Sequence, residues 1–231
     1  MAVDFGQFFI NSLPDLLSGL GYTLLLTFVS ITAGFLLGIA LALGRVYGNK
    51  IVNGFCVGYI ELIRGTPLLV QLFIIYFGLP SVGINFTPIQ AALLGLSINS
   101  GAYQAEYLRG SIQSVESGQM SAARSLGMNK LQSIQHVILP QALRICIPAW
   151  SNEFIYLLQY SSIAYIIQVA ELTAEGKFIA SQTFRYLEVF AMIAVIYLIL
   201  TIVSTEIIDR VAKHFSIPGI GAAKRVSLRD I

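Results

Sequence analysis

The 231-residue sequence is poor in charged residues, and this shortage excludes several classes of protein. Only 11% of the residues are charged, about half the share usual in soluble domains. Because 56% of the residues are hydrophobic, a water-soluble fold of this length could not bury its apolar surface. The same numbers exclude a disordered chain. The formal net charge of +2 excludes a polyanion-binding protein, so the composition predicts an integral membrane protein.

The sequence is equally poor in residues that form disulfides, metal sites and catalytic sets. The two cysteines, Cys56 and Cys146, lie in apolar stretches, and the two histidines, His136 and His214, are far apart. The chain has no G-x-x-x-x-G-K-[ST] sequence, so we expect no ATP to bind through a Walker motif. No nucleophile and base occur together in a recognisable set. We therefore expect no catalytic residue, no metal, no cofactor and no nucleic acid on this chain.

Five apolar stretches are long enough to cross the hydrocarbon of a membrane, which takes about 20 residues. They are residues 16–44, 51–80, 88–108, 137–169 and 186–208. The first is not expected to be a cleaved signal peptide, because Asp4 and Asp15 precede it and no Lys or Arg does. The sequence therefore predicts an all-α membrane protein with five transmembrane helices in a single domain, residues 1–231, or with four spans if the broken regions are only re-entrant.

Basic residues lie mostly on one side of these predicted spans. An excess of Lys and Arg marks the cytoplasmic loops, so the N-terminus is expected outside and the C-terminus in the cytoplasm. Only Lys177 and Arg185 fall on the opposite side. The basic residues on the cytoplasmic side are Arg45, Lys50, Arg109, Arg124, Lys130, Arg144, Arg210, Lys213, Lys224, Arg225 and Arg229.

The second stretch is interrupted by the sequence Glu61-Leu-Ile-Arg-Gly-Thr-Pro67. As one helix this stretch would be about 45 Å long, which exceeds the bilayer thickness. Pro67 lacks a backbone donor and Gly65 loosens the chain, so we predict a bend there. In the first stretch, Gly34 and Gly38 form a small-xxx-small pair that predicts close helix packing within the subunit.

The longest predicted cytoplasmic loop, residues 111–135, contains a short predicted helix at 119–126. Ala122, Ala123 and Leu126 share one face by their spacing, and Gly127 is a typical helix stop. Small side chains on such a face permit close contact with a partner protein. An ordinary amphipathic helix on the membrane surface explains the same pattern.

The spacing of this loop resembles the "EAA" loop of ABC importer permeases. The matching pattern is Ala122-Ala123-x3-Gly127-x9-Val137-x-Leu139-Pro140. The resemblance implies that the loop forms a coupling helix that docks on an ATPase subunit. Ser121 stands where the family usually has Glu, so the ion pair that this Glu would make is not implied here.

Further blocks are similar to permeases for polar amino acids, namely importers of histidine, glutamine and arginine. The resemblance covers residues 15–215 and implies a type I ABC importer permease in the cell (inner) membrane. It also implies an identical or homologous second permease, two ATPase subunits that hold ATP and magnesium, and an external substrate-binding protein. A passive channel, a membrane scaffold or an ABC permease for another small hydrophilic solute are the alternatives. The blocks are 61–71, 102–110, 139–144, 148, 152–155 and 171–173.

Polar and ionisable residues within the spans are candidates for the substrate path, because such groups are costly in lipid. Glu61 and Arg64 could form a structural ion pair or lie beside the path. Glu153 could attract an ammonium group, or it could link neighbouring helices together with Asn152. The path candidates are Glu61, Arg64, Thr66, Gln71, Asn152, Glu153, Tyr160, Ser161 and Ser162.

Three of these candidates follow the Asn-Glu-Phe block. Related permeases often have Lys-Asp-Thr/Ser-Ser where this chain has Gln159-Tyr-Ser-Ser162, so two charges are absent. Ser161 and Ser162 could replace the water around a solute or bond their own helix backbone. Tyr160 could offer a cation its ring face, or pack. The outer segment 163–185, with Glu171, Glu175 and Lys177, could contact the binding protein or be a solvated loop.

Overall fold

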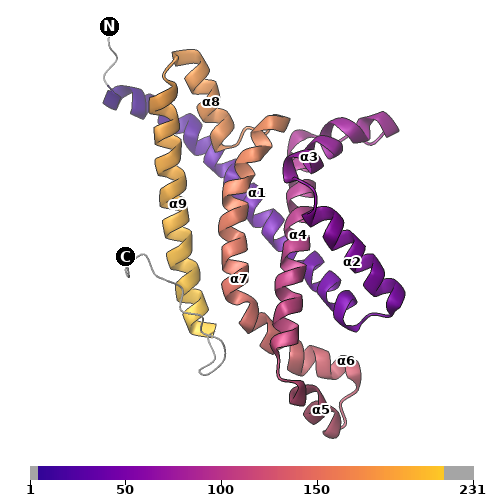
Figure 1. Cartoon of the computed structure of the whole chain (residues 1–231). Helices are drawn as coiled ribbons and strands as arrows, with labels where there is room; N and C mark the ends of the chain where they lie inside the picture. The colour runs from indigo at the N-terminus through magenta and orange to yellow at the C-terminus, as the bar shows by residue number, and fades with distance from the viewer. Residues whose placement is uncertain (1–4, 216–231) are drawn as a thin grey trace.

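Helices form nearly all of residues 5–215, the part of the chain that this computed structural model describes (Figure 1). No strand occurs among these residues, which confirms the predicted all-α class. The α-helices are α1 (Phe5–Tyr47), α2 (Lys50–Arg64), α3 (Leu68–Phe73), α4 (Pro88–Ser114), α5 (Ser117–Ser125), α6 (Lys130–Ser133), α7 (Leu139–Tyr160), α8 (Leu172–Thr183) and α9 (Tyr186–Phe215). Tighter or wider turns follow α3 (Ile74–Gly78 and Leu79–Val82), precede α7 (Ile134–Ile138) and follow it (Ser161–Ile167).

The long helix α1 crosses the bundle obliquely and packs against α4 (Figure 1). Its 43 residues would extend about 65 Å, so it runs well beyond one bilayer thickness. A Cβ on Gly34 would lie 2.9 Å from Nε2 of Gln104, and one on Gly38 would lie 3.0 Å from Cβ of Gln104. The predicted close packing of these glycines within the chain is confirmed.

Two helices of the described chain, Gly6–Tyr47 and Tyr186–Ala212, are long and apolar enough to cross a membrane by themselves. The pair Lys50–Arg64 and Leu68–Val82 also qualifies together, as a broken span or a re-entrant loop, but it is bent by 100°. This confirms the bend predicted at Gly65 and Pro67. Length and composition thus support two or three spans.

The helix α4 is the centre of the arrangement, since α1, α2, α3 and α7 all pack on it. It begins with a capping box in which Thr87 and Gln90 satisfy each other's backbone N–H groups. Leu26 of α1, Leu96 of α4 and Leu157 of α7 belong to one buried apolar cluster. The short helices α5 and α6 lie at one end of the bundle and α8 lies at the other (Figure 1).

Candidate functional site

The bend between α2 and α3 is held by the side chain of Gln71. Its amide nitrogen lies 2.7 Å from the carbonyl oxygen of Ile63, and 3.0 Å and 2.9 Å from the carbonyl and hydroxyl oxygens of Thr66. Its amide oxygen accepts a hydrogen bond of 3.2 Å from Nδ2 of Asn99 on α4. A broken helix leaves carbonyl groups without partners, which is costly in hydrocarbon. Gln71 therefore bonds these carbonyls and fastens the bend to α4.

Glu106 on α4 is the centre of a charged cluster that we call the arginine hub (Arg45, Arg64, Glu106 and Arg109). Arg45 of α1 forms an ion pair with Glu106, and Nη2 of Arg109 lies 2.9 Å from Oε2 of Glu106. Nη1 of Arg64, at the end of α2, lies 3.9 Å from the same oxygen. Within residues 5–215, the ion pair of Arg64 is thus with Glu106 and not with Glu61. The hub joins α1, α2 and α4.

Glu153 on α7 is buried and faces α4 rather than an open path. Its Oε1 accepts a hydrogen bond of 2.7 Å from the hydroxyl of Ser100. Nε2 of Gln104 lies 3.0 Å from the Ser100 hydroxyl and 3.2 Å from the carbonyl oxygen of Ile31 on α1. These bonds join α1, α4 and α7, which favours the interpretation of Glu153 as a link between helices.

Some polar side chains near the end of α7 form hydrogen bonds with the backbone, and others are exposed. The hydroxyls of Ser161 and Ser162 each donate to a backbone carbonyl three residues earlier, at 2.7 Å and 2.6 Å. This favours the interpretation that they bond their own helix backbone. Asn152 and Tyr160 are exposed, and the Tyr160 ring stacks on Tyr156 with centroids 6.2 Å apart. Asn152 and Tyr160 are therefore open to a solute or to a partner chain.

The helix α5 lies in the predicted coupling segment and ends as the sequence predicts. Gly127 has a φ of +83°, its N–H donates to the carbonyl of Arg124 at 3.0 Å, and the N–H of Met128 donates to that of Ala123 at 3.2 Å. This is a Schellman ending, which favours glycine because the backbone is left-handed. The residues expected to share one face of this helix differ in exposure, since Ala123 is 3% exposed whereas Leu126 is 81% exposed.

The other residues of the matching loop lie on α5 or follow it in the chain. Ser121 and Ala122 are exposed on the helix itself. Val137 lies in the wide turn before α7 and packs against the cluster that contains Ile138. Leu139 begins α7 and Pro140 is its second residue, directly after the wide turn Ile134–Ile138, whose altered hydrogen bonds accommodate a residue that has no backbone N–H.

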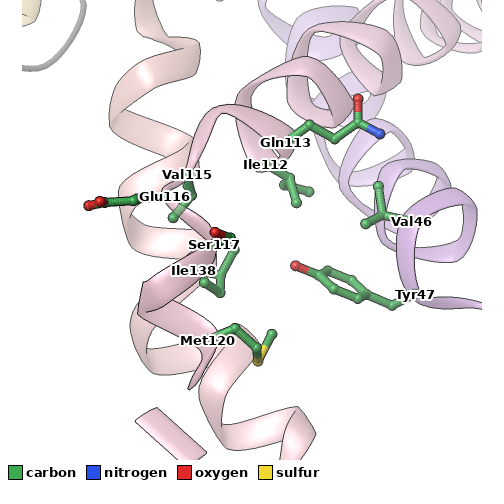
Figure 2. Close-up of a pocket in the computed structure, with 9 residues that line it drawn as sticks. All are labelled: Val46, Tyr47, Ile112, Gln113, Val115, Glu116, Ser117, Met120 and Ile138. Atoms are coloured by element: carbon green, nitrogen blue, oxygen red, sulfur yellow. The ribbon is translucent and has the colours of Figure 1, made fainter. Parts of the chain in front are cut away.

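A cavity of about 280 Å³ separates α5 from the end of α1 (Figure 2). Figure 2 shows the Tyr47 ring pointing into it from α1, Met120 pointing in from α5, and the Glu116 carboxylate turned away. On α6, Nζ of Lys130 lies 3.4 Å from the carbonyl oxygen of Tyr47 and 5.6 Å from its ring centroid. These contacts of Lys130 connect the segment that carries α5 to α1, beside the cavity.

At the opposite end of the bundle, Glu171 caps α8. Its two carboxylate oxygens accept bonds of 2.9 Å from backbone N–H groups of the first turn, and the Tyr197 hydroxyl lies 3.1 Å from Oε2. Glu171 is fully buried, so its carboxylate is neither solvated nor exposed to a binding protein. Lys177 is exposed over the Tyr165 ring. Burial raises the pKa of the Glu175 carboxyl, and nearby Asp15 raises it further.

Comparison with known proteins identifies a family that is consistent with this all-helical fold. Residues 34–217 match the family described as "Binding-protein-dependent transport system inner membrane component". The chain belongs to this family. It is therefore a non-catalytic permease subunit of an ABC importer, in which a separate chain is the ATPase.

Two relatives and one solved structure illustrate the similarity of this permease to others. It is 39% identical to the nopaline transport system permease protein NocM of Agrobacterium fabrum, over 87% of this chain and 88% of that protein. It is 37% identical to the glutamine transport system permease protein GlnP of Escherichia coli K12, over 89% and 95%. A structure described as an amino acid ABC transporter with histidines has a TM-score of 0.85 and 42% identity, covering 93% of this chain and all of that one.

The sequence did not single out several residues that organise this permease. The bend is held to α4 by Asn99, and the link to Glu153 is formed by Ser100 and Gln104. Half of the arginine hub consists of Arg45 and Glu106. Only Glu106 left a usable signal, because it is an ionisable residue within a predicted span, and such residues are rare without a partner. Asn99, Ser100 and Gln104 are neutral and give no such signal.

Proposed function

We propose that this permease forms the path of an importer for polar amino acids, with five spans provided by α1, the α2–α3 pair, α4, α7 and α9. The helices α4 and α7 have 27 and 22 residues, enough for a span of about 20 residues. The names of the relatives support the substrate class, since they are permeases for glutamine and nopaline. Competition between labelled amino acids would identify which of them the importer carries.

The proposed orientation has the N-terminus outside and the C-terminus in the cytoplasm. The end of the bundle that carries α5 and α6 also carries Arg109, Arg124 and Lys130, whereas Lys177 lies on α8 at the opposite end (Figure 1). The excess of basic residues supports a cytoplasmic location for the α5 end. In this orientation residues 111–135 form the cytoplasmic coupling loop and α8 faces the substrate-binding protein.

The observation that carries the proposal is the exposed face of α5. Ala122 and Leu126 are one helical turn apart and both exposed, and the Schellman ending at Gly127 fixes where the helix stops. A small residue beside an exposed leucine permits close approach of a partner backbone. Two ATPase subunits would hold two such helices, one from this permease and one from an identical or homologous second permease. Their closure on ATP would move the spans between inward-open and outward-open states.

Within the proposed path, the candidate residues differ in what they can offer a solute. The side chains of Gln71, Thr66 and Glu153 are engaged in helix-to-helix or backbone bonds. Arg64 and Asn152 are exposed in this chain, as are Glu61 and Tyr160. We propose that Arg64 and Asn152 contact the solute and that Gln71 and Glu153 shape the path.

The test compares Ala122→Trp with Ala122→Ser in the complete transporter. If the exposed face of α5 docks on the ATPase, the bulky tryptophan should hold the two proteins apart. It should abolish co-purification of the ATPase and ATP-dependent uptake of labelled amino acids by vesicles, whereas serine should retain both.

Two results would contradict the proposal. Wild-type ATPase binding and uptake by Ala122→Trp would remove α5 from the docking surface. Uptake by the wild-type vesicles that is independent of ATP would instead identify a passive channel. A protease-protection pattern like that of the wild type would confirm that the Ala122 variants insert normally.

A further inference from the structure

A second cavity, of about 310 Å³, lies at the end of the bundle that carries α8 (Figure 1). It is formed by residues 168–170, which precede α8, and by one face of that helix, and we call it the α8 groove. Apart from Glu175 and Gln168 its side chains are apolar, and that of Phe178 is 58% exposed. The lining residues are Gln168, Val169, Ala170, Ala174, Glu175 and Phe178.

The α8 groove is built on a helix that is held from two sides. The N–H of Leu172 donates to the Thr23 hydroxyl of α1 at 3.2 Å, and the Tyr197 hydroxyl of α9 lies 3.1 Å from Oε2 of Glu171. A Cβ on Gly19 of α1 would lie only 2.9 Å from the backbone of Leu172, so the two helices are in close contact. A surface that is already fixed loses little conformational entropy when a partner binds to it.

The α8 groove has negative charge beside it that the described chain does not neutralise. Glu175 lines the groove, and its Cγ would lie 2.9 Å from a Cβ on Gly19 of α1. Asp15, one turn before Gly19, is close enough to repel the Glu175 carboxylate. Neither carboxylate forms an ion pair within residues 5–215, and Lys177 is directed at the Tyr165 ring, 5.0 Å from its centroid. A cation from another molecule is therefore favoured here.

An apolar wall with a carboxylate at one end suits an arginine side chain. Its methylene groups would cover Ala174, and its guanidinium would stack on the Phe178 ring and donate to the Glu175 carboxylate. An anionic lipid head group would be repelled by Glu175 and Asp15. A second copy of this chain, paired about a two-fold axis at the groove, would bring two such acidic pairs together.

We propose that the α8 groove receives an arginine side chain of the substrate-binding protein. The family to which the chain belongs is described as binding-protein-dependent. The proposed orientation places α8 on the outer side of the membrane, where such a protein would dock, so this inference rests on the proposed function. It adds the contact that recognises the partner. Arginine is among the residues that contribute most to binding at protein interfaces.

The test measures ATP-dependent uptake by vesicles that contain the complete transporter, at increasing concentrations of the substrate-binding protein that supports uptake by the wild type. Glu175→Gln should raise the concentration needed for half-maximal uptake about tenfold, because it removes a charge-assisted hydrogen bond. Phe178→Ala should raise it about threefold, because it removes the stacked ring. Both variants should keep the wild-type maximal rate, since saturation with the binding protein compensates for a weaker contact.

Glu188→Gln is the matched control for the loss of a carboxylate. Glu188 lies in the first turn of α9, at the same end of the bundle but outside the groove, so the half-maximal concentration should change less than about twofold. Glu175→Gln should keep or raise the unfolding temperature, because it removes the repulsion between Glu175 and Asp15. A purely structural role of Glu175 would instead lower that temperature and overturn the proposal.

Reversal of the charge tests the identity of the partner residue. Glu175→Arg should abolish uptake at the concentration of binding protein that half-saturates the wild type, because two arginines would then face each other. Surface arginines of the binding protein are replaced by glutamate one at a time. One such replacement should weaken uptake by the wild-type permease and restore uptake by Glu175→Arg.

The proposal is overturned if Glu175→Gln has the wild-type half-maximal concentration, if it lowers only the maximal rate, or if no arginine replacement restores uptake by Glu175→Arg. Separation of the two permease subunits by Glu175→Gln would assign the groove to the second permease and also overturn it. Wild-type uptake that needs neither ATP nor a binding protein would contradict the proposed function itself. Uptake that needs both but does not respond to Glu175→Gln would overturn this inference alone.

Discussion

Replacing Gln71 by leucine should release the bend between α2 and α3 while keeping most of the side-chain volume. The substitution removes the donors that face the Ile63 and Thr66 carbonyls at 2.7 Å and 3.0 Å, and the acceptor that faces Asn99 at 3.2 Å. A buried acceptor without a partner costs about 1–3 kcal/mol, and each lost bond about 0.5–1.5 kcal/mol. Because the Thr66 carbonyl lies next to the turn and can be partly solvated, we expect a total loss of about 2–4 kcal/mol.

The assay is thermal unfolding of the purified transporter in detergent, together with ATP-dependent uptake. Asn99→Ala removes only the bond of 3.2 Å and should cost about 1 kcal/mol. Gln182→Leu makes the same chemical change at an exposed position of α8 and should change stability by less than about 0.5 kcal/mol. The reasoning is refuted if Gln71→Leu unfolds at the wild-type temperature, or if Asn99→Ala costs as much as Gln71→Leu.

Three further substitutions test other contacts by the same unfolding assay. Gly176→Ala would place a Cβ 1.9 Å from Cδ1 of Ile193, so it should push α8 from α9 and cost about 1–3 kcal/mol; wild-type stability would disprove this packing. Gly127→Ala should cost about 1–2 kcal/mol because its φ is +83°, whereas Gly118→Ala, in open space on α5, should be neutral or stabilising; equal effects would contradict the Schellman ending. Ser100→Ala removes the donor to the buried carboxylate on α7 and should cost about 1–3 kcal/mol, and no change would show that this link is unimportant.

The parts of the fold that sequence predicts well are those decided by a few neighbouring residues. Pro67 cannot continue a helix, and the chain bends by 100° beside it. Gly127 can adopt a left-handed backbone without strain, and α5 stops there. The pair Gly34 and Gly38 predicts close approach, although their spacing does not reveal that the approaching helix is α4.

The contacts between distant residues could not be predicted in the same way. Arg45 and Glu106 are 61 positions apart, so their ion pair depends on how α1 crosses α4. The spacing of Glu61 and Arg64 fits an ion pair on one helix face, but the three-dimensional arrangement offers Arg64 the carboxylate of Glu106 instead. Glu171 reads as a residue of a solvated loop, yet it caps α8 and is buried beside Tyr197.

Some candidates for the substrate path bond to other helices or to the backbone, and others are exposed, because the sequence does not reveal contacts between distant residues. A polar side chain within a span needs a partner, but the sequence does not say whether that partner is a solute, a helix or its own backbone. Gln71 satisfies two broken-helix carbonyls, and Glu153 accepts from Ser100. Asn152, by contrast, is exposed on α7.

The most direct test of the proposed mechanism places a photo-crosslinking amino acid at Leu126 in the complete transporter within membranes. Leu126 is 81% exposed at the end of α5, and Leu187, which is 82% exposed at the start of α9 at the opposite end of the bundle, is the control position. The account predicts that light joins position 126 to the ATPase subunit and does not join position 187 to it. Crosslinks from position 126 to lipid alone, or equal crosslinking of both positions to the ATPase, would contradict the central claim that α5 couples the ATPase to the path.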